Sequence, residues 1–416
     1  MVLMQDVFEP LGLAGRLLLR YWPQLLLLAV IGSLLHDLLL EAAVRAGMDN
    51  ALLGMVILSL VVLAKLAVIV MMFSVVRPAL AGLAALDQTK AGTSSPAEHR
   101  GDHILAVTAA AILPFFVYYA AWGFLGDTVR EYSRIALSRV PFGESAHFLD
   151  LLQARWLVAS IVLCWLIRWF AKYMNKRAGV PYWRFLVVAC DATWLFIGLY
   201  GIGIYKDQLI EKLGAGAFAA WSFIGEAQAA ETFRPVEFTP LGFWADLQNL
   251  FFFALLPLVW LVMAAIINGY EVVGAGKPVA ETVATASSWR RWLGDFIGHF
   301  LGGYRSRYAP VWKCVRLTFA AGPATLLTLV IAYQAVSWAG AWLWVGITRW
   351  IGAADLVTWQ MLASPITIFI GSPSDLDGGI LLDAVRICLL AAVLDHAVSS
   401  GTRRNDEISA ARGRLA

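Results

Sequence analysis

Among the charged residues of the sequence, Lys65 has the position that most strongly indicates a functional site. It lies inside the apolar run 52–74, where an ammonium group costs about 3 kcal/mol or more and therefore needs a partner. Asp191 lies in another apolar run, 184–205, at a similar depth from the same side of the predicted membrane. We expect these two residues to pair. As a functional site the pair would gate or relay ions or protons, and as a structural bridge it would fix the register of two helices.

Asp383 and Arg386 form a second candidate pair. They lie three residues apart in the apolar run 379–396, which places them on the same face of a helix. An ion pair within one helix lowers the cost of inserting both charges into a membrane. Because Arg386 lies nearer the middle of the run, it needs either Asp383 or an acceptor from another helix.

The sequence contains no motif that fixes a reaction. Asp37 and Glu41 share a helix face near the end of the first apolar run. They could act as base and metal holder in an enzyme for lipid-linked sugars, but solvated charges at a helix end are the simpler explanation. No Walker, G-x-S-x-G, H-E-x-x-H or C-x-x-C pattern occurs. We predict no catalytic residue, no metal ion and no cofactor, and an enzyme is the least favoured class.

The composition indicates what must position these charges. Of 416 residues, 60% are hydrophobic and 15% charged, and the mean hydropathy is +0.70, against about 45–50% and about 25% for ordinary soluble domains. Eight apolar runs approach the ~20 residues that a helix needs to cross a bilayer. They predict an all-α, polytopic transmembrane helical bundle that forms one integral membrane domain over residues 1–416. The predicted spans are 23–43, 52–74, 104–126, 154–172, 184–205, 247–270, 317–346 and 379–396.

The segment 356–374 is an ambiguous ninth apolar run. It carries no charge and is long enough to span, but Pro365 and Pro373 interrupt it. Counting it as a span would also move the basic tail 397–416 to the other side of the membrane. We expect a shallow or re-entrant segment, because irregular backbone at membrane depth is tolerated where protein or water covers it.

The distribution of basic residues predicts the orientation. With eight spans, 21 of the 32 Lys and Arg residues fall on the side of the two termini and nine on the other side. Cytoplasmic loops carry the excess of positive charge. We therefore expect both termini in the cytoplasm and a bacterial cytoplasmic (inner) membrane.

The connection 271–316 is the longest cytoplasmic segment and is basic. Its residues 288–303 have the apolar periodicity of an amphipathic helix, which suits a position beside anionic lipid headgroups. Gly294, Gly298 and Gly302 form a stripe that would permit close packing of another helix. The N-terminal segment 1–22 has a weaker pattern of the same kind.

These features leave three function classes. We favour a membrane component of a transport or secretion-type assembly, with other membrane subunits or further copies of the chain as partners besides the lipid bilayer. The alternatives are a stand-alone solute or lipid transporter that uses Lys65 and Asp191, and an enzyme that acts on a lipid-linked substrate. A net charge of +3 gives no reason to expect nucleic acid. A water-filled cavity around the intramembrane charges would favour the transporter.

Overall fold

The computed structural model describes residues 2–84, 100–121, 124–140, 154–178, 181–213, 243–274, 322–353, 355–371 and 379–413. All regular structure in these ranges is helical and no strand is found in them, so the predicted all-helical class is confirmed there. The helices are α1 (Val2–Asp49), α2 (Ala51–Val76), the 3-10 helix η1 (Arg77–Ala79), α4 (Arg100–Ala121), α5 (Phe124–Leu137), α6 (Ala154–Ala178), α7 (Pro181–Leu213), α9 (Phe243–Gly274), α11 (Pro323–Ile351), α12 (Leu356–Ile370) and α13 (Ile380–Gly413).

The first helix is much longer than the predicted span. α1 has 48 residues, about 72 Å at 1.5 Å per residue. It continues through Pro10 and Pro23, because strong helix formers (Leu, Ala, Met, Arg, Glu and Gln) fill most of the other positions. The segment 1–22 and the span 23–43 are therefore parts of one continuous helix.

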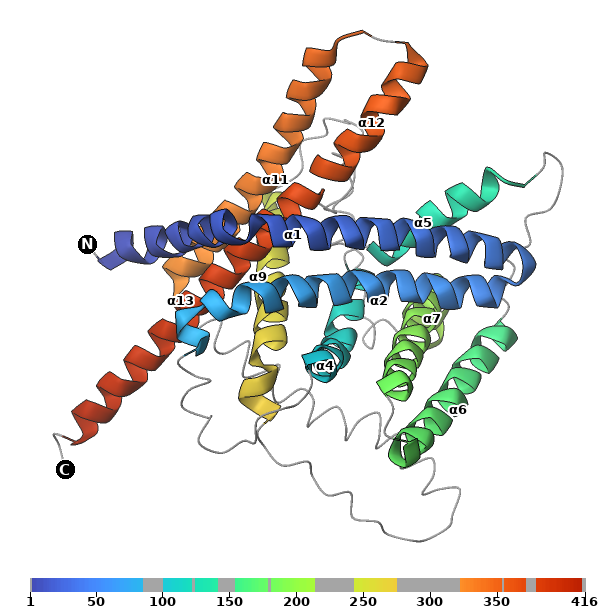
Figure 1. Ribbon diagram of the computed structural model, residues 1–416, viewed down its shortest axis with the longest axis horizontal. Helices are drawn as coiled ribbons and strands as arrows, with labels where there is room; N and C mark the ends of the chain where they lie inside the picture. Colours follow the sequence, from blue (N-terminus) through green and yellow to red (C-terminus); the bar gives the residue numbers. More distant parts are fainter. Residues whose placement is uncertain are drawn as a thin grey trace.

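Asn50 turns the chain between α1 and α2. Its Oδ1 accepts the backbone N–H groups of Leu52 and Leu53 at 3.0 and 3.4 Å, and Asn is among the strongest N-capping residues. Because this single residue connects the helices, α1 and α2 lie side by side as an antiparallel hairpin (Figure 1).

Two glycines allow the closed end of this hairpin to pack. A Cβ atom added at Gly54 would lie 2.7 Å from the Cα of Gly47, and one added at Gly47 would collide with the Tyr132 hydroxyl of α5. The backbones of α1 and α2 and the Tyr132 side chain of α5 thus meet where only glycine leaves room.

We expect Gly54→Ala to lower the free energy of unfolding by about 1–3 kcal/mol, the usual cost of overpacking. The closest atom is backbone, so α1 must move away from α2. The matched control is Gly198→Ala on α7, where an added Cβ meets nothing within 4 Å. Thermal unfolding in detergent measures both variants. Equal unfolding temperatures for the two would contradict this packing.

The other helices pack around the hairpin (Figure 1). α2 contacts α4, α7 and α9, while α6 packs against α7. α13 runs along α1 and also contacts α2, α9, α11 and α12. Large side chains that are fully buried fill the space where these helices meet: Leu25, Leu58, Leu66, Phe73, Phe115, Phe116, Phe196 and Leu261.

A buried carboxylate joins α13 to the segment that follows η1. Asp395 is 6% exposed, and its Oδ1 accepts the backbone N–H groups of Gly82 and Leu83 at 2.8 and 3.1 Å. The contact satisfies two main-chain donors that would otherwise be buried without an acceptor. It fixes the position of α13 relative to the end of α2.

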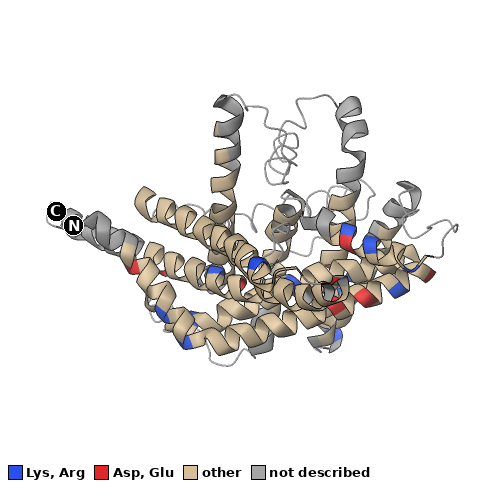
Figure 2. Cartoon of the chain, turned by 90° about the horizontal axis from the view of Figure 1, so that it is seen from above, with Lys and Arg blue, Asp and Glu red and all other residues tan. Residues whose placement is uncertain are grey.

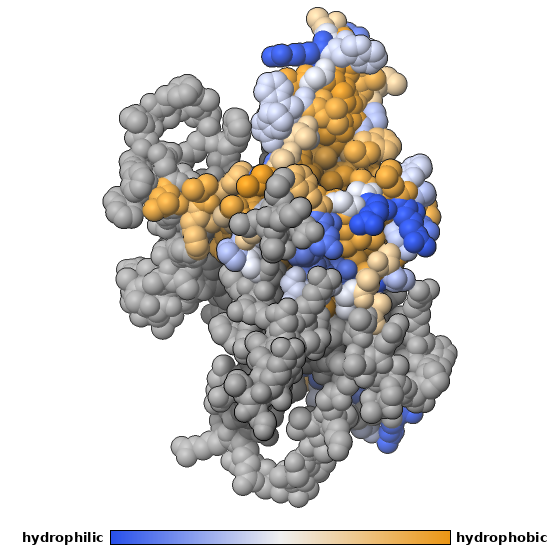
Figure 3. All heavy atoms as spheres, turned by 90° about the vertical axis from the view of Figure 1, so that its left-hand side faces the viewer, coloured by the Kyte–Doolittle hydropathy of each residue, from blue (hydrophilic) through white to orange (hydrophobic). Residues whose placement is uncertain are grey.

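α11 and α12 form a second hairpin that projects from the other helices (Figure 1). Gly322 and Gly352 bound α11 with φ angles of +92° and +73°, which glycine adopts without strain. Pro323 occupies the first turn, where its missing N–H costs nothing. Hydrophobic side chains cover much of the projecting part (Figure 3), and Trp350 is 88% exposed.

α12 corresponds to the ambiguous apolar segment 356–374. Its 15 residues measure about 22 Å, less than the ~30 Å of a hydrocarbon core. The helix runs through Pro365, so the expected interruption at this proline is wrong. In apolar helices, neighbouring helices and small local adjustments can satisfy the backbone group that a proline leaves without a partner. A re-entrant position for this segment stays a prediction.

The apolar helices indicate a membrane protein. Among the described residues, four helices are long and apolar enough to span: Phe8–Asp49, Ala51–Ala79, Tyr182–Tyr200 and Pro323–Ile351. Most of the ribbon that is not grey in Figure 2 carries no charged residue. The predicted count of about eight spans is not confirmed.

The other predicted spans stay predictions. α13 carries Asp383, Arg386 and Asp395 within its apolar part, and each charge lowers the mean hydropathy. In α9 the described apolar stretch is Phe253–Asn268.

Several predictions on the cytoplasmic connection lie outside the described residues. They concern the connection 271–316 beyond the end of α9, the amphipathic helix 288–303 and the stripe of Gly294, Gly298 and Gly302. The structure does not test these expectations, and they stay predictions.

Candidate functional site: a polar cavity among apolar helices

A cavity of about 590 Å³ lies where the two hairpins meet the other helices. We call it the central cavity. Its wall is built from α1, α2, α4, α5, α9, α11, α12 and α13. The titratable side chains that line it among the described residues, tyrosines aside, are His36, Lys65, Arg130, Glu131, Arg134, Asp383 and Arg386. Such a concentration of charge within an apolar body is the most unusual feature of this structure.

Arg386 of α13 is held from two helices. Its Nη1 lies 3.5 Å from Asp383 Oδ1, and its Nη2 donates to the Ser337 hydroxyl of α11 at 3.1 Å. The guanidinium also lies 5.2 Å from the centroid of the Tyr333 ring, within the range of a cation–π contact. With a side chain only 13% exposed, this cation is fixed in the wall of the central cavity.

Lys65 of α2 lies in another part of the same wall. Its Nζ is 5.9 Å from the centroid of the Tyr119 ring of α4, and that ring packs on Phe115 at a centroid distance of 4.4 Å. Aromatic faces attract an ammonium group without neutralising it. The helix α4 therefore holds this lysine beside the cavity.

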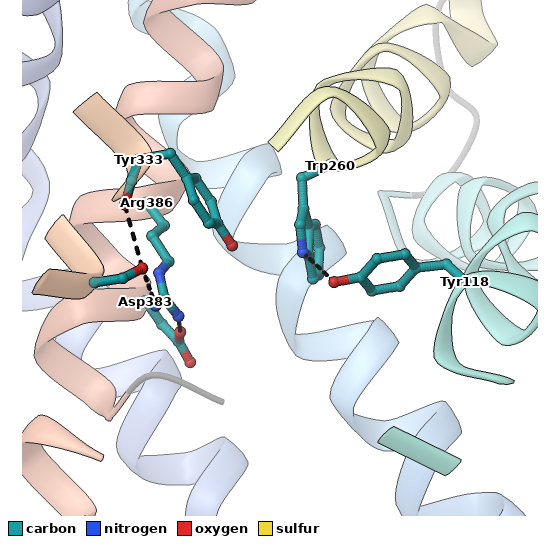
Figure 4. A network of polar contacts seen from close by, with 6 residues as sticks. Tyr118, Trp260, Tyr333, Asp383 and Arg386 are labelled. Carbon is teal, nitrogen blue, oxygen red and sulfur yellow. Dashed lines mark hydrogen bonds and ion pairs between the residues drawn. The ribbon is translucent and has the colours of Figure 1, made fainter. Parts of the chain in front are cut away.

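Trp260 and Tyr118 form the side of the cavity contributed by α9 and α4. The indole Nε1 donates to the Tyr118 hydroxyl at 2.7 Å, and the two rings meet edge to face at 5.2 Å. Figure 4 shows this pair opposite the group of Arg386, Asp383 and Tyr333. All five side chains line the central cavity.

α5 covers the cavity at the end of the α1–α2 hairpin. His36 Nε2 of α1 lies 3.9 Å from Glu131 Oε2 of α5, and Arg139, after the end of α5, forms an ion pair with Glu41 of α1. The hydrogen bond to Glu41 raises the pKa of the Arg139 guanidinium, so this tether stays cationic at every physiological pH. The two contacts fix α5 where it contributes Arg134 to the wall.

Of the four predicted intramembrane charges, the structure brings three to one cavity and pairs the fourth with another residue. Lys65, Asp383 and Arg386 line one cavity. Asp191 is not among the residues that line it: its Oδ1 lies 2.5 Å from Arg168 Nε of α6 and accepts the Trp194 indole N–H at 3.3 Å. The proposed partner of Lys65 therefore has another partner, because α6 is the neighbour of α7 on the side of Asp191 whereas Lys65 faces α4.

Sequence reasoning missed the cavity residues of α5. The connection between the predicted spans 104–126 and 154–172 has no predicted helix of its own, but Phe124–Leu137 is a helix. The signal was present, since the apolar residues of this segment recur at helical spacing. Arg130 and Arg134, four residues apart, share the helix face that lines the cavity.

The arrangement can bind a polar molecule. Among the described residues, no group of three His, Cys, Asp or Glu side chains could hold a metal ion. The lining combines cations, hydroxyl and indole donors, and apolar side chains, which is the composition of a ligand site. Comparisons of the chain with protein-family models, curated proteins and solved structures find no match, so its function is inferred from the chemistry of the central cavity.

Proposed function

We propose that this protein is a membrane transporter whose solute or lipid substrate binds in the central cavity. The observation that carries the proposal is that Lys65, Asp383 and Arg386, from two apolar helices, line one cavity of about 590 Å³. Charged side chains within membrane helices usually face a bundle interior or an aqueous cavity, and they mark substrate pathways. Transporters bind their substrates at such sites between helices.

The cavity favours a transporter over a membrane scaffold in a larger assembly. A scaffold would hold its intramembrane charges in compact ion pairs between helices, as Arg168 and Asp191 are held. A cavity lined by several charges has no use in that role. An enzyme is less favoured, because among the described residues of the wall the His36 imidazole and the Glu131 carboxylate lie 3.9 Å apart, beyond hydrogen-bond distance.

We also propose the orientation that the basic residues indicate. Both termini lie in the cytoplasm of a bacterial inner membrane, and the basic segments 271–316 and 397–416 lie beside anionic lipid headgroups. In this orientation α5, between the predicted spans of α4 and α6, lies on the outer side.

Purification from the native host in a gentle detergent, followed by native mass spectrometry, tests the proposed function. We expect a monomer or homo-oligomer that carries a bound small molecule or lipid, released on unfolding in an amount proportional to the protein. Stable co-purification with other subunits, and no retained ligand, would support the scaffold and contradict the transporter.

A further inference from the structure

Pro257 interrupts the hydrogen-bond ladder of α9. The helix continues through this residue from Phe243 to Gly274, but proline has no backbone N–H, so the carbonyl group four residues earlier loses its helical donor. That carbonyl belongs to Phe253, at the start of the apolar stretch Phe253–Asn268. Lipid tails offer no replacement for the missing donor. The Phe253 carbonyl therefore needs a donor from outside the ladder of α9.

Gln334 of α11 supplies this donor. Its side-chain Nε2 donates to the Phe253 carbonyl oxygen at 2.9 Å. A glutamine amide in an apolar helix is costly unless it forms hydrogen bonds, and such side chains commonly bond across to neighbouring membrane helices. The contact joins α11 to the part of α9 that precedes Pro257.

The part of α9 that follows Pro257 is joined to a different helix. The Trp260 indole donates to the Tyr118 hydroxyl of α4 at 2.7 Å, and its ring meets the ring of Phe115 edge to face at 6.4 Å. Sharp bends in long helices occur mainly at prolines. The two parts of α9 on either side of Pro257 are thus held by α11 and by α4.

Both parts of α9 line the central cavity. Leu256 precedes Pro257 and Trp260 follows it, and the two residues belong to the cavity wall. Tyr333, the neighbour of Gln334 on α11, lies in the part of the wall opposite Trp260 (Figure 4). A change in the bend of α9 at Pro257 would therefore move two sides of the cavity relative to each other.

On the basis of the proposed function, we infer that Pro257 is a hinge at which α9 bends when access to the central cavity changes, and that the hydrogen bond from Gln334 to the Phe253 carbonyl locks this hinge in the state of this structure. A transporter must alternate the side from which its binding site is reached. When the lock opens, α11 moves relative to α4, with Pro257 as the pivot.

A double-variant cycle tests the lock. Gln334→Leu removes the donor, and we expect it to lower the unfolding temperature in detergent. In Pro257→Ala the new backbone N–H donates to the Phe253 carbonyl within α9, so Gln334→Leu should lose at least half of its effect in that background. Ser337→Ala is the matched control, because this residue of α11 contacts Arg386 instead, and its effect should be the same in both backgrounds. Equal effects of Gln334→Leu in the two backgrounds would overturn the lock.

Pulsed electron paramagnetic resonance tests the hinge. Spin labels replace Ile331 of α11 and Phe185 of α7, which are 61% and 48% exposed, in the full-length chain without its four native cysteines. Because α7 packs against α4, the two labels report the position of α11 relative to α4. We expect Gln334→Leu to populate a second distance. Adding Pro257→Ala should suppress that distance, since a complete hydrogen-bond ladder resists bending.

Pro365→Ala replaces a proline inside α12 and is the control, which should leave the distances unchanged. The hinge is overturned if Gln334→Leu does not alter the distances, or if adding Pro257→Ala does not reverse the change. Ligand retention separates this failure from that of the proposed function. A rigid protein that still carries its ligand overturns the hinge alone, whereas a protein from the native host that co-purifies with other subunits and retains no ligand contradicts the transporter.

Discussion

Replacing Asp191 by Asn is expected to lower the free energy of unfolding by about 3–5 kcal/mol, the usual cost of breaking a buried ion pair. The side chains of Arg168 and Asp191 are only 12% and 21% exposed. Without the carboxylate, α6 retains a buried guanidinium that has lost its counter-ion. We expect Arg168→Met to destabilise as well, by leaving the carboxylate unpaired. Chemical or thermal unfolding in detergent measures both effects.

The double variant Arg168→Met with Asp191→Asn decides between structure and function for this pair. Replacing both charges removes the unpaired ion, and such double replacements are often nearly neutral. We therefore expect most of the lost stability to return. Arg184→Met is the matched control, because Arg184 is an exposed cation on the same helix as Asp191. Single variants as stable as the wild type would contradict the buried pair.

Replacing Arg386 by Met is expected to reduce the ligand that co-purifies with the protein by tenfold or more, with little change in stability. A charge-assisted hydrogen bond contributes about 1.5–3 kcal/mol, and tenfold corresponds to about 1.4 kcal/mol. Stability changes little because the partner Asp383 is 39% exposed and can be hydrated from the cavity. Native mass spectrometry and thermal unfolding, on the same preparation, measure the two quantities.

Two further variants control this experiment. Ser337→Ala removes one acceptor of the Arg386 guanidinium while leaving the charge, so we expect a smaller loss of ligand. Arg349→Met removes an exposed cation away from the cavity and should leave the ligand unchanged. A fully occupied Arg386→Met protein would show that this arginine is structural.

Apolar run length predicted several of the helices, whereas the helix-breaking residues that bound them are evident only in the structure. Asn50, Gly322 with Pro323, and Gly352 bound helices as local chain chemistry requires. The continuation of α1 from Val2 was not predictable, because Pro10 and Pro23 indicate helix boundaries that the structure does not have. Four of the described helices are long and apolar enough to span a membrane, and the count of about eight stays a prediction.

The candidate site was predictable only in part. A helix period assigns Asp383 and Arg386 to one face, so their proximity follows from the sequence. The partner of Asp191 does not follow, because spacing within a helix says nothing about which helix lies beside it. Depth in the membrane was the basis for pairing Lys65 with Asp191, and depth alone allows several partners. Because α6 packs against α7, Arg168 is the residue that pairs with Asp191.

Cysteine accessibility at two adjacent positions of α1 tests most directly whether the central cavity is a transport pathway. Ser33 lines the cavity, whereas Leu34 is 64% exposed on the outer surface of the helix. In a background without the four native cysteines, a membrane-impermeant thiol reagent is applied separately from each side. We expect Ser33→Cys to react from both sides, as alternating access requires, and Leu34→Cys to be protected by lipid. Reaction of Ser33→Cys from one side only, or from neither, would contradict a transport pathway.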